Sequence, residues 1–243
     1  MPLGTDRVFL VTGSNAGIGL EIVKQLAQAG HIVYLASRNV EAGKKAQDEL
    51  SAQGVTVKLV QLDVTDAQSL AAASKTIEEA ESRLDVLVNN AGMHFKPQSA
   101  LDVDIATVRA ACEVNLFGLI QTCQTFLPLL RKSSHAIILN ISTDMASNAY
   151  QARPDSQLHV VAYNTSKAAA NSYTIALAHE LKSVGIKVNA ITPGFTTTKL
   201  NNYAPGGKTT QQAAADILPW ALLDKEGPTG LFIGPDGKKE FPW

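Results

Sequence analysis

The first half of the chain alternates short apolar runs with stretches in which apolar residues recur every three or four positions. Residues 7–12 form an apolar run without polar alternation, which is typical of a strand buried on both faces. In the residues that follow, Ile18, Ile22 and Leu26 lie at helical spacing, and Gly30 stands where a helix commonly ends. The pattern predicts a buried strand followed at once by a helix.

The same alternation continues along the chain. Further strands are predicted at residues 31–36, 55–62, 85–89, 136–141, 187–192 and 231–234, and further helices at residues 40–53, 66–82, 104–131 and 162–184. Such alternation builds right-handed units that place parallel strands in one sheet with helices on both of its faces. No linker-like stretch divides the chain. We therefore expect a single α/β domain over residues 1–243, with a Rossmann-type doubly wound parallel β-sheet of about seven strands.

The composition limits the partners of such a domain. Of 243 residues, 21 are Lys or Arg and 22 are Asp or Glu, and the formal net charge of -1 comes without any basic run. This balance offers no positive surface to nucleic acid or to an anionic membrane. The longest uncharged stretch, residues 114–130, is too short and too polar to span a bilayer, and the first residues lack the features of a signal peptide. We expect a cytoplasmic protein with a small-molecule partner.

The cysteines and histidines indicate neither a disulfide nor a metal site. Cys112 and Cys123 fall in one predicted helix, roughly 16 Å apart along its axis, which is too far for a disulfide. No group of His, Cys, Asp and Glu residues has the spacing of metal ligands. We expect two free thiols and no bound metal.

A glycine-rich turn stands between the first strand and the first helix. Residues 12–19 read TGSNAGIG. Glycines there let the backbone approach a ligand closely, and the start of the helix offers free N–H groups and partial positive charge to a pyrophosphate. The chain has no Gly-x-x-x-x-Gly-Lys-Ser/Thr motif, which disfavours a P-loop nucleotide hydrolase. The turn predicts dinucleotide binding.

The end of the second strand indicates which dinucleotide is bound. An acidic residue there would bind the 2′-hydroxyl of the adenosine ribose, whereas a basic one accommodates a 2′-phosphate. The strand ends in Ser37 and Arg38 without an acid. The Arg38 guanidinium matches a phosphate, and the Ser37 hydroxyl adds a hydrogen bond. We predict NADP(H) as the cofactor.

Tyr163 and Lys167 open the helix predicted after the fifth strand. Residues four apart lie on one helical face, so the Lys167 ammonium lies close to the Tyr163 hydroxyl. A nearby cation lowers the pKa of a tyrosine from its usual value near ~10, and this would make Tyr163 an acid or base. The spacing alone is common and is equally compatible with a packing tyrosine and a solvated lysine.

In combination, these motifs resemble the short-chain dehydrogenase/reductase superfamily over nearly the whole chain. The matching features are the TGSNAGIG turn, Asp63-Val64, the NNAG turn at residues 89–92, Asn115, Ser142, the Tyr163-x-x-x-Lys167 pair and Pro193-Gly194. Their order along the chain is very specific. The resemblance implies a hydride-transferring oxidoreductase.

The resemblance also implies catalytic roles. Tyr163 would donate a proton to the carbonyl oxygen of the substrate, and Ser142 would hydrogen-bond the same oxygen. Lys167 would hold the ribose hydroxyls of the nicotinamide and tune Tyr163. Asn115 would support a water-linked proton path to the lysine. Hydride comes from the cofactor, so the protein supplies placement and electrostatics.

The residues and the resemblance together give one set of cofactor-binding positions. These are Gly13, Ser14, Asn15, Ile18, Gly19, Ser37, Arg38, Asp63, Val64, Asn90, Ala91, Gly92, Tyr163, Lys167, Pro193, Gly194 and Thr196. Several neighbouring residues are placed either to line a substrate pocket or to pack as ordinary core: Met93, His94, Phe95, Met145, Tyr150 and Phe195. We expect His94 at the pocket edge or the surface, not as a base.

Three features depart from compact members of the superfamily. Residues 148–160 lengthen the segment between Ser142 and Tyr163 and predict a polar loop on the rim of the site. This insertion and the C-terminal tail resemble the carbonyl reductase branch, which favours a monomer or a homodimer over a tetramer. Residues 195–210 predict a short mobile substrate loop, and a small loop favours a bulky carbonyl substrate.

The prediction from the sequence is an NADPH-dependent carbonyl reductase that converts a ketone or aldehyde to an alcohol, with Asn115, Ser142, Tyr163 and Lys167 as its catalytic set. Two alternatives stay open. An NADP+-dependent alcohol dehydrogenase would run the same chemistry in the oxidative direction. A non-catalytic NADP(H)-sensing protein would keep the fold as a binding module, although it would have no use for Ser142.

Overall fold

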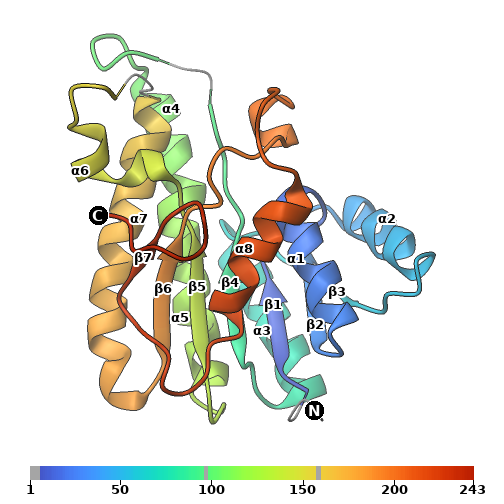
Figure 1. Cartoon of the computed structure of the whole chain (residues 1–243). Helices are drawn as coiled ribbons and strands as arrows, with labels where there is room; N and C mark the ends of the chain where they lie inside the picture. The colour runs from blue at the N-terminus through green and yellow to red at the C-terminus, as the bar shows by residue number, and fades with distance from the viewer. Residues whose placement is uncertain (1–5, 96–97, 157–159) are drawn as a thin grey trace.

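The computed structural model describes residues 6–95, 98–156 and 160–243. The strands of this part form one parallel sheet of seven in the order β3-β2-β1-β4-β5-β6-β7 (Figure 1). The strands are β1 (Val8–Val11), β2 (Ile32–Ser37), β3 (Lys58–Gln61), β4 (Val86–Asn89), β5 (Ile137–Ile141), β6 (Lys187–Ile191) and β7 (Phe232–Ile233). The order runs outward in opposite directions from the neighbours β1 and β4. The predicted doubly wound Rossmann-type sheet is confirmed.

Helices cover both faces of the sheet (Figure 1). The α-helices of the described residues are α1 (Gly17–Gln28), α2 (Val40–Ser51), α3 (Ala67–Glu81), α4 (Ile105–Cys112), α5 (Leu119–Leu130), α6 (Asn148–Gln151), α7 (Val161–Leu181) and α8 (Thr210–Ala221). Apolar side chains of α1, α2 and α8 pack in a core on one face, and those of α3, α5 and α7 pack in a core on the other. None of the helices in the described ranges is long and apolar enough to cross a membrane.

The first strand shows why the chain forms this sandwich of layers. Successive side chains of a strand point to opposite faces, so an uninterrupted apolar run is stable only where both faces are covered. In β1, Phe9 and Val11 pack in the core beneath α1, whereas Val8 and Leu10 pack in the core beneath α3 and α5. All four side chains are buried. The lack of alternating polar residues in the sequence of β1 therefore indicates that both faces of this strand are buried.

Three local features differ from the sequence-based expectations. The predicted helix 104–131 is interrupted by η1 (Glu113–Gly118), a wider π-helical segment between α4 and α5. Part of the predicted 148–160 loop is the short helix α6, while residues 157–159 lie outside the described residues. Helix α8 was not predicted, although Thr209 and Gln212 form a capping box at its start, a signal that a sequence can display.

The topology decides where a ligand can bind. In an open parallel sheet the crevice lies beyond the carboxyl ends of the strands, at the point where the strand order reverses. Here that point lies between β1 and β4, which pair directly through Phe9 and Val86. The segments that follow β1 and β4 are the glycine-rich turn and the NNAG turn, so the topology brings both motifs to one place.

Candidate active site

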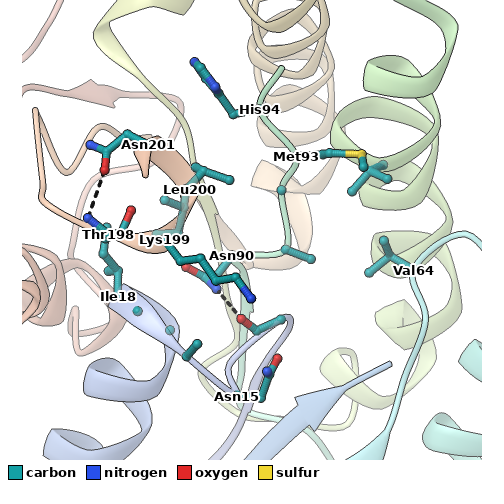
Figure 2. Close-up of a pocket in the computed structure, with 18 of the residues that line it drawn as sticks. Asn15, Ile18, Val64, Asn90, Met93, His94, Thr198, Lys199, Leu200 and Asn201 are labelled. Carbon is teal, nitrogen blue, oxygen red and sulfur yellow. Dashed lines mark hydrogen bonds between the residues drawn. The ribbon is translucent and has the colours of Figure 1, made fainter. Parts of the chain in front are cut away.

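A cavity of about 830 Å³ opens at the carboxyl edge of the sheet (Figure 2). The predicted site residues that line it are Gly13, Asn15, Ile18, Gly19, Arg38, Asp63, Val64, Asn90, Ala91, Gly92, Ser142, Tyr163, Lys167 and Pro193. Ser14, Ser37, Asn115, Gly194 and Thr196, all within the described residues, lie outside its lining. Segments that are far apart in the sequence thus meet around a single space.

The glycine-rich turn is tied to the NNAG turn by a set of hydrogen bonds. The Asn90 side-chain amide donates to the carbonyls of Thr12 and Gly13, at 2.9 and 3.0 Å. In return the Thr12 hydroxyl accepts from the backbone N–H groups of Asn90 and Ala91, both at 3.0 Å. A Cβ on Gly13 would lie 2.9 Å from the Cα of Ala91, and one on Gly19 would overlap the Asn90 amide. Only glycine fits at these two positions.

The start of α1 is suited to an anion. Its N-cap residue, Ala16, provides no side-chain hydrogen bond, and the first turn contains no acidic residue. The first N–H groups of the helix therefore keep their partial positive charge and face the cavity that Gly17 and Ile18 line. The glycine-rich turn, packed closely against the NNAG turn, forms a glycine cradle for a ligand. This cradle and the start of α1 fit the pyrophosphate of a dinucleotide.

The two serines predicted at the cofactor site are engaged within the protein. The Ser14 hydroxyl donates to Val11 O at 2.7 Å and accepts from the N–H of Ala36 at 3.0 Å, which ties the glycine-rich turn to β2. The Ser37 hydroxyl donates to Asn39 O at 2.8 Å. Both side chains are buried, and neither lines the cavity. Arg38 is exposed and does line it.

Lys167 is almost fully buried, with 4% of its surface exposed. Its ammonium donates to the backbone carbonyl of Ile141, the last residue of β5, at 2.8 Å. A Cβ on Gly92 would lie 3.6 Å from Lys167 Nζ and 3.5 Å from Asn115 Oδ1, so the lysine, the asparagine and the NNAG turn converge. Tyr163 lies one helical turn before Lys167 and is also buried.

Burial shifts the pKa values of this pair in opposite directions. It lowers the pKa of Lys167 to about 8 and raises the pKa of Tyr163, with a smaller contribution from the negative charge of Asp144. The expectation that Lys167 lowers the pKa of Tyr163 is therefore wrong for this structure, because loss of hydration disfavours the phenolate and Lys167 is not among the groups that shift this pKa. Tyr163 consequently stays a protonated phenol, the form that donates a proton.

Asn115 is held by the segment beside the cavity. Its amide donates to Met93 O at 2.9 Å and to the Ser166 hydroxyl at 3.0 Å, and its Oδ1 accepts from the Met93 N–H at 2.8 Å. The π-helical segment η1 carries this side chain, and such segments are frequent at functional sites. Asn115 thus connects α7 to the chain that follows the NNAG turn.

Ser142 and Thr143 directly follow β5, and each carries a hydroxyl group. The Ser142 hydroxyl lines the cavity but donates to Asn171 Oδ1 of α7 at 2.7 Å. The next residue, Thr143, donates its hydroxyl to Asp144 Oδ1 at 3.1 Å. Thr143 is not among the predicted site residues, although it directly follows Ser142 in the sequence.

Part of the cavity lining is apolar or aromatic. Met93, His94 and Phe95 belong to it, and the His94 ring meets Tyr163 edge-on with centroids 5.0 Å apart. Burial lowers the pKa of His94. Met145, Tyr150 and Phe195, the other pocket candidates, are described residues outside the lining. Lining residues that the sequence analysis did not name individually are Ala16, Gly17, Leu62, Val114, Ile141, Thr198, Lys199, Leu200, Asn201 and Asn202.

Cys112 and Cys123 are both free thiols, as predicted. They lie in separate helices, α4 and α5, on either side of η1. Within residues 6–95, 98–156 and 160–243, no group of three or more His, Cys, Asp or Glu side chains is placed to hold a metal ion.

The sheet topology, the glycine cradle and the buried Tyr163–Lys167 pair define a nucleotide-dependent α/β oxidoreductase. Residues 7–208 match the family model described as short chain dehydrogenase. The chain therefore belongs to the short-chain dehydrogenase/reductase family, whose members use NAD(P)(H) and act on carbonyl or alcohol groups of small molecules.

Relatives span almost the entire chain. (+)-Neomenthol dehydrogenase from Arabidopsis thaliana is 29% identical over 295 aligned residues, covering 98% of this chain and 99% of the relative. The crystal structure of NADPH-bound carbonyl reductase from chicken fatty liver superposes with a TM-score of 0.86 at 25% identity, covering 98% and 99% of the two chains. The structure of ElxO with NADP bound gives a TM-score of 0.84 at 26% identity, covering 96% and 98%.

Removing the buried charge of Lys167 is expected to stabilise the fold at neutral pH. Because the pKa of Lys167 is lowered to about 8 from 10.5, the unfolded chain binds more protons than the folded one between these values, and wild-type stability rises with pH there. Lys167→Met should therefore raise the free energy of unfolding at pH 7 by about 1–3 kcal/mol. The gain should shrink as the pH approaches 10.5.

Urea denaturation at pH 7 and pH 9.5 measures this difference. Lys182→Met, at an exposed lysine just after α7, is the matched control and should change stability by less than about 0.5 kcal/mol at both values. A gain for Lys167→Met that is the same at both pH values would contradict the lowered pKa.

Proposed function

We propose that the protein is an NADPH-dependent carbonyl reductase that converts a ketone or aldehyde to an alcohol. The observation that carries the proposal is that one cavity is lined both by the glycine cradle and by the buried, protonated Tyr163. The likeness to the NADPH-bound carbonyl reductase of chicken fatty liver supports the same reaction class.

The proposed reaction divides into a hydride transfer and a proton transfer. When bound, the cofactor supplies the hydride to the carbonyl carbon and is thereby oxidised. The Tyr163 hydroxyl gives its proton to the carbonyl oxygen, so that the C=O group becomes CH–OH. A hydroxyl at the end of β5, assigned to Ser142, hydrogen-bonds the same oxygen while negative charge develops on it.

Lys167 and Asn115 complete the proposed catalytic set. The Lys167 ammonium, fixed on Ile141 O, lies on the Gly92 side of the cavity, where it would bind the ribose hydroxyls next to the nicotinamide. Because it lies one turn after Tyr163, Lys167 would also resupply a proton to the tyrosine after each turnover. Asn115 holds Met93 and Ser166, and we assign it the support of a water-linked proton path to the lysine.

We assign NADP(H) as the cofactor on the basis of Arg38. Arg38 lines the adenosine end of the cavity together with Asp63 and Val64. No carboxylate of the described residues forms an ion pair with Arg38, so its guanidinium is available to a 2′-phosphate. The NADP-bound structures of two relatives support this choice.

For the substrate we propose a bulky, largely apolar carbonyl compound. Met93, Phe95 and Leu200 line the cavity, and we assign residues 195–210, of which 198–202 line it, as the substrate loop. The whole chain, 1–243, acts as one domain in this proposal, because its motifs come from both halves of the sheet. We also propose a cytoplasmic protein that acts as a monomer or a homodimer.

The oxidative direction is the second candidate. The reaction is reversible, and one relative is named (+)-neomenthol dehydrogenase. In that direction a tyrosinate takes a proton from the alcohol. The raised pKa of Tyr163 favours the phenol, which is the form that the reductive step uses.

Tyr163→Phe tests the proton donor. Loss of the hydroxyl should lower kcat by about 10²–10⁴-fold. The dissociation constant for NADPH should change little. Activity is measured with NADPH and a panel of ketones, aldehydes and quinones, and binding by fluorescence titration. Tyr173→Phe, on the same helix and outside the cavity lining, is the control and should keep full activity. Turnover that survives in Tyr163→Phe would refute the mechanism, and a wild type inactive on the whole panel would favour the NADP(H) sensor.

Ser142→Ala and Thr143→Val compare the two hydroxyls at the end of β5. Loss of the group that binds the carbonyl oxygen should lower kcat by about 10²–10³-fold without weakening NADPH binding. We expect this loss for Ser142→Ala and a smaller one for Thr143→Val. Because the Ser142 proton is donated to Asn171, its hydroxyl must turn toward the substrate. A larger loss in Thr143→Val would transfer the role to Thr143.

Arg38→Asp tests cofactor choice. The carboxylate should repel the 2′-phosphate and accept a hydrogen bond from a free 2′-hydroxyl, so the ratio of kcat/KM for NADPH to that for NADH should fall by about 100-fold or more. Arg131→Asp, an exposed charge change at the end of α5, should leave the ratio unaltered. An unchanged ratio in Arg38→Asp would remove this residue from the 2′-phosphate site.

A further inference from the structure

A short turn, residues 198–202, lines the cofactor cavity close to the glycine-rich turn. A Cβ on Gly17 would lie 3.9 Å from Thr198 Cγ2, so the turn stands directly over the start of α1. Lys199 and its neighbours line the same cavity as Asn90. Figure 2 shows the Lys199 side chain extending into this cavity on the side of Asn90.

The backbone around Lys199 is fixed by local hydrogen bonds. Asn201 Oδ1 accepts from the N–H of Thr198 at 3.0 Å, and the Asn201 amide donates to Thr196 O at 2.9 Å. The N–H of Tyr203 donates to Thr198 O at 2.8 Å. Lys199 therefore starts from a defined backbone position, and less conformational entropy is lost when its ammonium binds a ligand.

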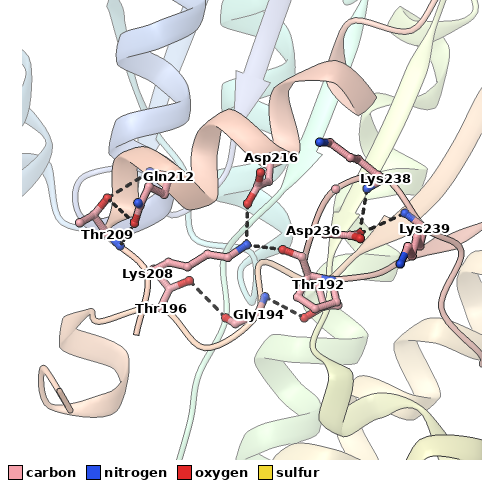
Figure 3. A network of polar contacts seen from close by, with 12 residues as sticks. Thr192, Gly194, Thr196, Lys208, Thr209, Gln212, Asp216, Asp236, Lys238 and Lys239 are labelled. Carbon is pink, nitrogen blue, oxygen red and sulfur yellow. Dashed lines mark hydrogen bonds and ion pairs between the residues drawn. The ribbon is translucent and has the colours of Figure 1, made fainter. Parts of the chain in front are cut away.

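The two ends of the substrate loop lie side by side, with Thr196 next to Lys208 (Figure 3). The N–H of Lys208 donates to Phe195 O at 2.9 Å, and the N–H of Thr197 donates to Lys208 O at 3.0 Å. The Lys208 ammonium binds Asp216 of α8 at 2.5 Å and also donates to Pro235 O. The loop is thus anchored to α8 and to the segment after β7, so the turn keeps its place above α1.

The charges around Lys199 are not balanced by the protein. Among the described residues, no carboxylate lies within ion-pair distance of Lys199. The nearby start of α1 carries partial positive charge, and neither a cap side chain nor an acid in its first turn offsets it. Two positive groups that face each other repel, and an anion bound between them would stabilise both.

We propose that Lys199 binds the pyrophosphate of the dinucleotide, from the side opposite the N-terminus of α1. This inference rests on the proposed function, since it needs a dinucleotide in the cavity. It gives the two exposed cations that line the cavity separate roles: Arg38 binds the 2′-phosphate at the adenosine end, and Lys199 binds the bridging phosphates. A lysine suits this position because its ammonium acts as a compact charge toward phosphate oxygens.

Three probes separate these roles. NADPH contains both the pyrophosphate and the 2′-phosphate, NADH contains only the pyrophosphate, and adenosine 2′-monophosphate contains only the 2′-phosphate. Loss of the Lys199 charge should therefore weaken NADPH and NADH by the same factor and leave adenosine 2′-monophosphate unchanged. Loss of the Arg38 charge should weaken NADPH and adenosine 2′-monophosphate and leave NADH unchanged.

The experiment measures dissociation constants of these probes by calorimetry for the full chain and its variants. Lys199→Met should raise the constants for NADPH and NADH by about tenfold each, the effect of one charge-assisted hydrogen bond. The increase should diminish at high salt. Lys199→Arg should bind nearly as the wild type does. Lys225→Met, at an exposed lysine between α8 and β7, is the matched control and should bind all three probes normally.

Several results would overturn the proposal. If Lys199→Met binds NADPH and NADH as the wild type does, Lys199 has no part in phosphate binding. If it loses affinity for all three probes alike, Lys199 acts on the adenosine end or on the fold, and a thermal melt compared with Lys199→Arg distinguishes these causes. If the wild type binds neither NADPH nor NADH, the proposed function itself fails, and the assignment of Lys199 falls with it.

Discussion

The geometry of the site depends on α7, a helix whose buried face carries several polar side chains that bond to neighbouring elements. Its buried pairs are Ser166 with Asn115, Lys167 with Ile141, Asn171 with Ser142, and Thr174 with Asn140. A buried polar group without a partner costs about 1–3 kcal/mol, and a rotation of the helix by one residue would break all four pairs. Tyr163, one turn before Lys167, is therefore directed to the cavity by hydrogen bonds that it does not itself make.

The same constraint makes the site poorly hydrated, which sets its acid–base character. The pairing buries Lys167 against β5 and buries Tyr163 with it, so the charged forms of both side chains are disfavoured together. A tyrosine on an exposed helix would keep its ordinary pKa and would be coupled to the lysine mainly by charge. In this protein, the loss of hydration has the largest effect on the pKa values of both side chains. The arrangement therefore favours proton donation from a neutral phenol, whereas proton abstraction would need additional positive charge near Tyr163.

The fold could be predicted because it is recorded in local patterns, whereas parts of the site depend on contacts between distant segments. The apolar run of β1 and the glycines after it identify both a buried strand and a phosphate turn. In contrast, the engagement of Ser14 and Ser37 with the backbone of neighbouring segments is visible only once β1 and β2 are paired. The π-helical segment around Asn115 follows the apolar spacing of an ordinary helix, so no sequence signal separates it from α4 and α5.

The segment after Pro193 shows a further limit of predicting structure from local composition. Its Thr-, Asn- and Gly-rich sequence predicts a mobile loop, and the capping box of Thr209 and Gln212 that begins α8 is hidden among similar residues. Because α8 packs against α1, it brings Asp216 to Lys208 and holds the loop near the cavity. The loop can then be short and still reach the ligand. A long mobile loop would have to lose much more entropy to place one charge, and so α8 has a direct bearing on cofactor binding.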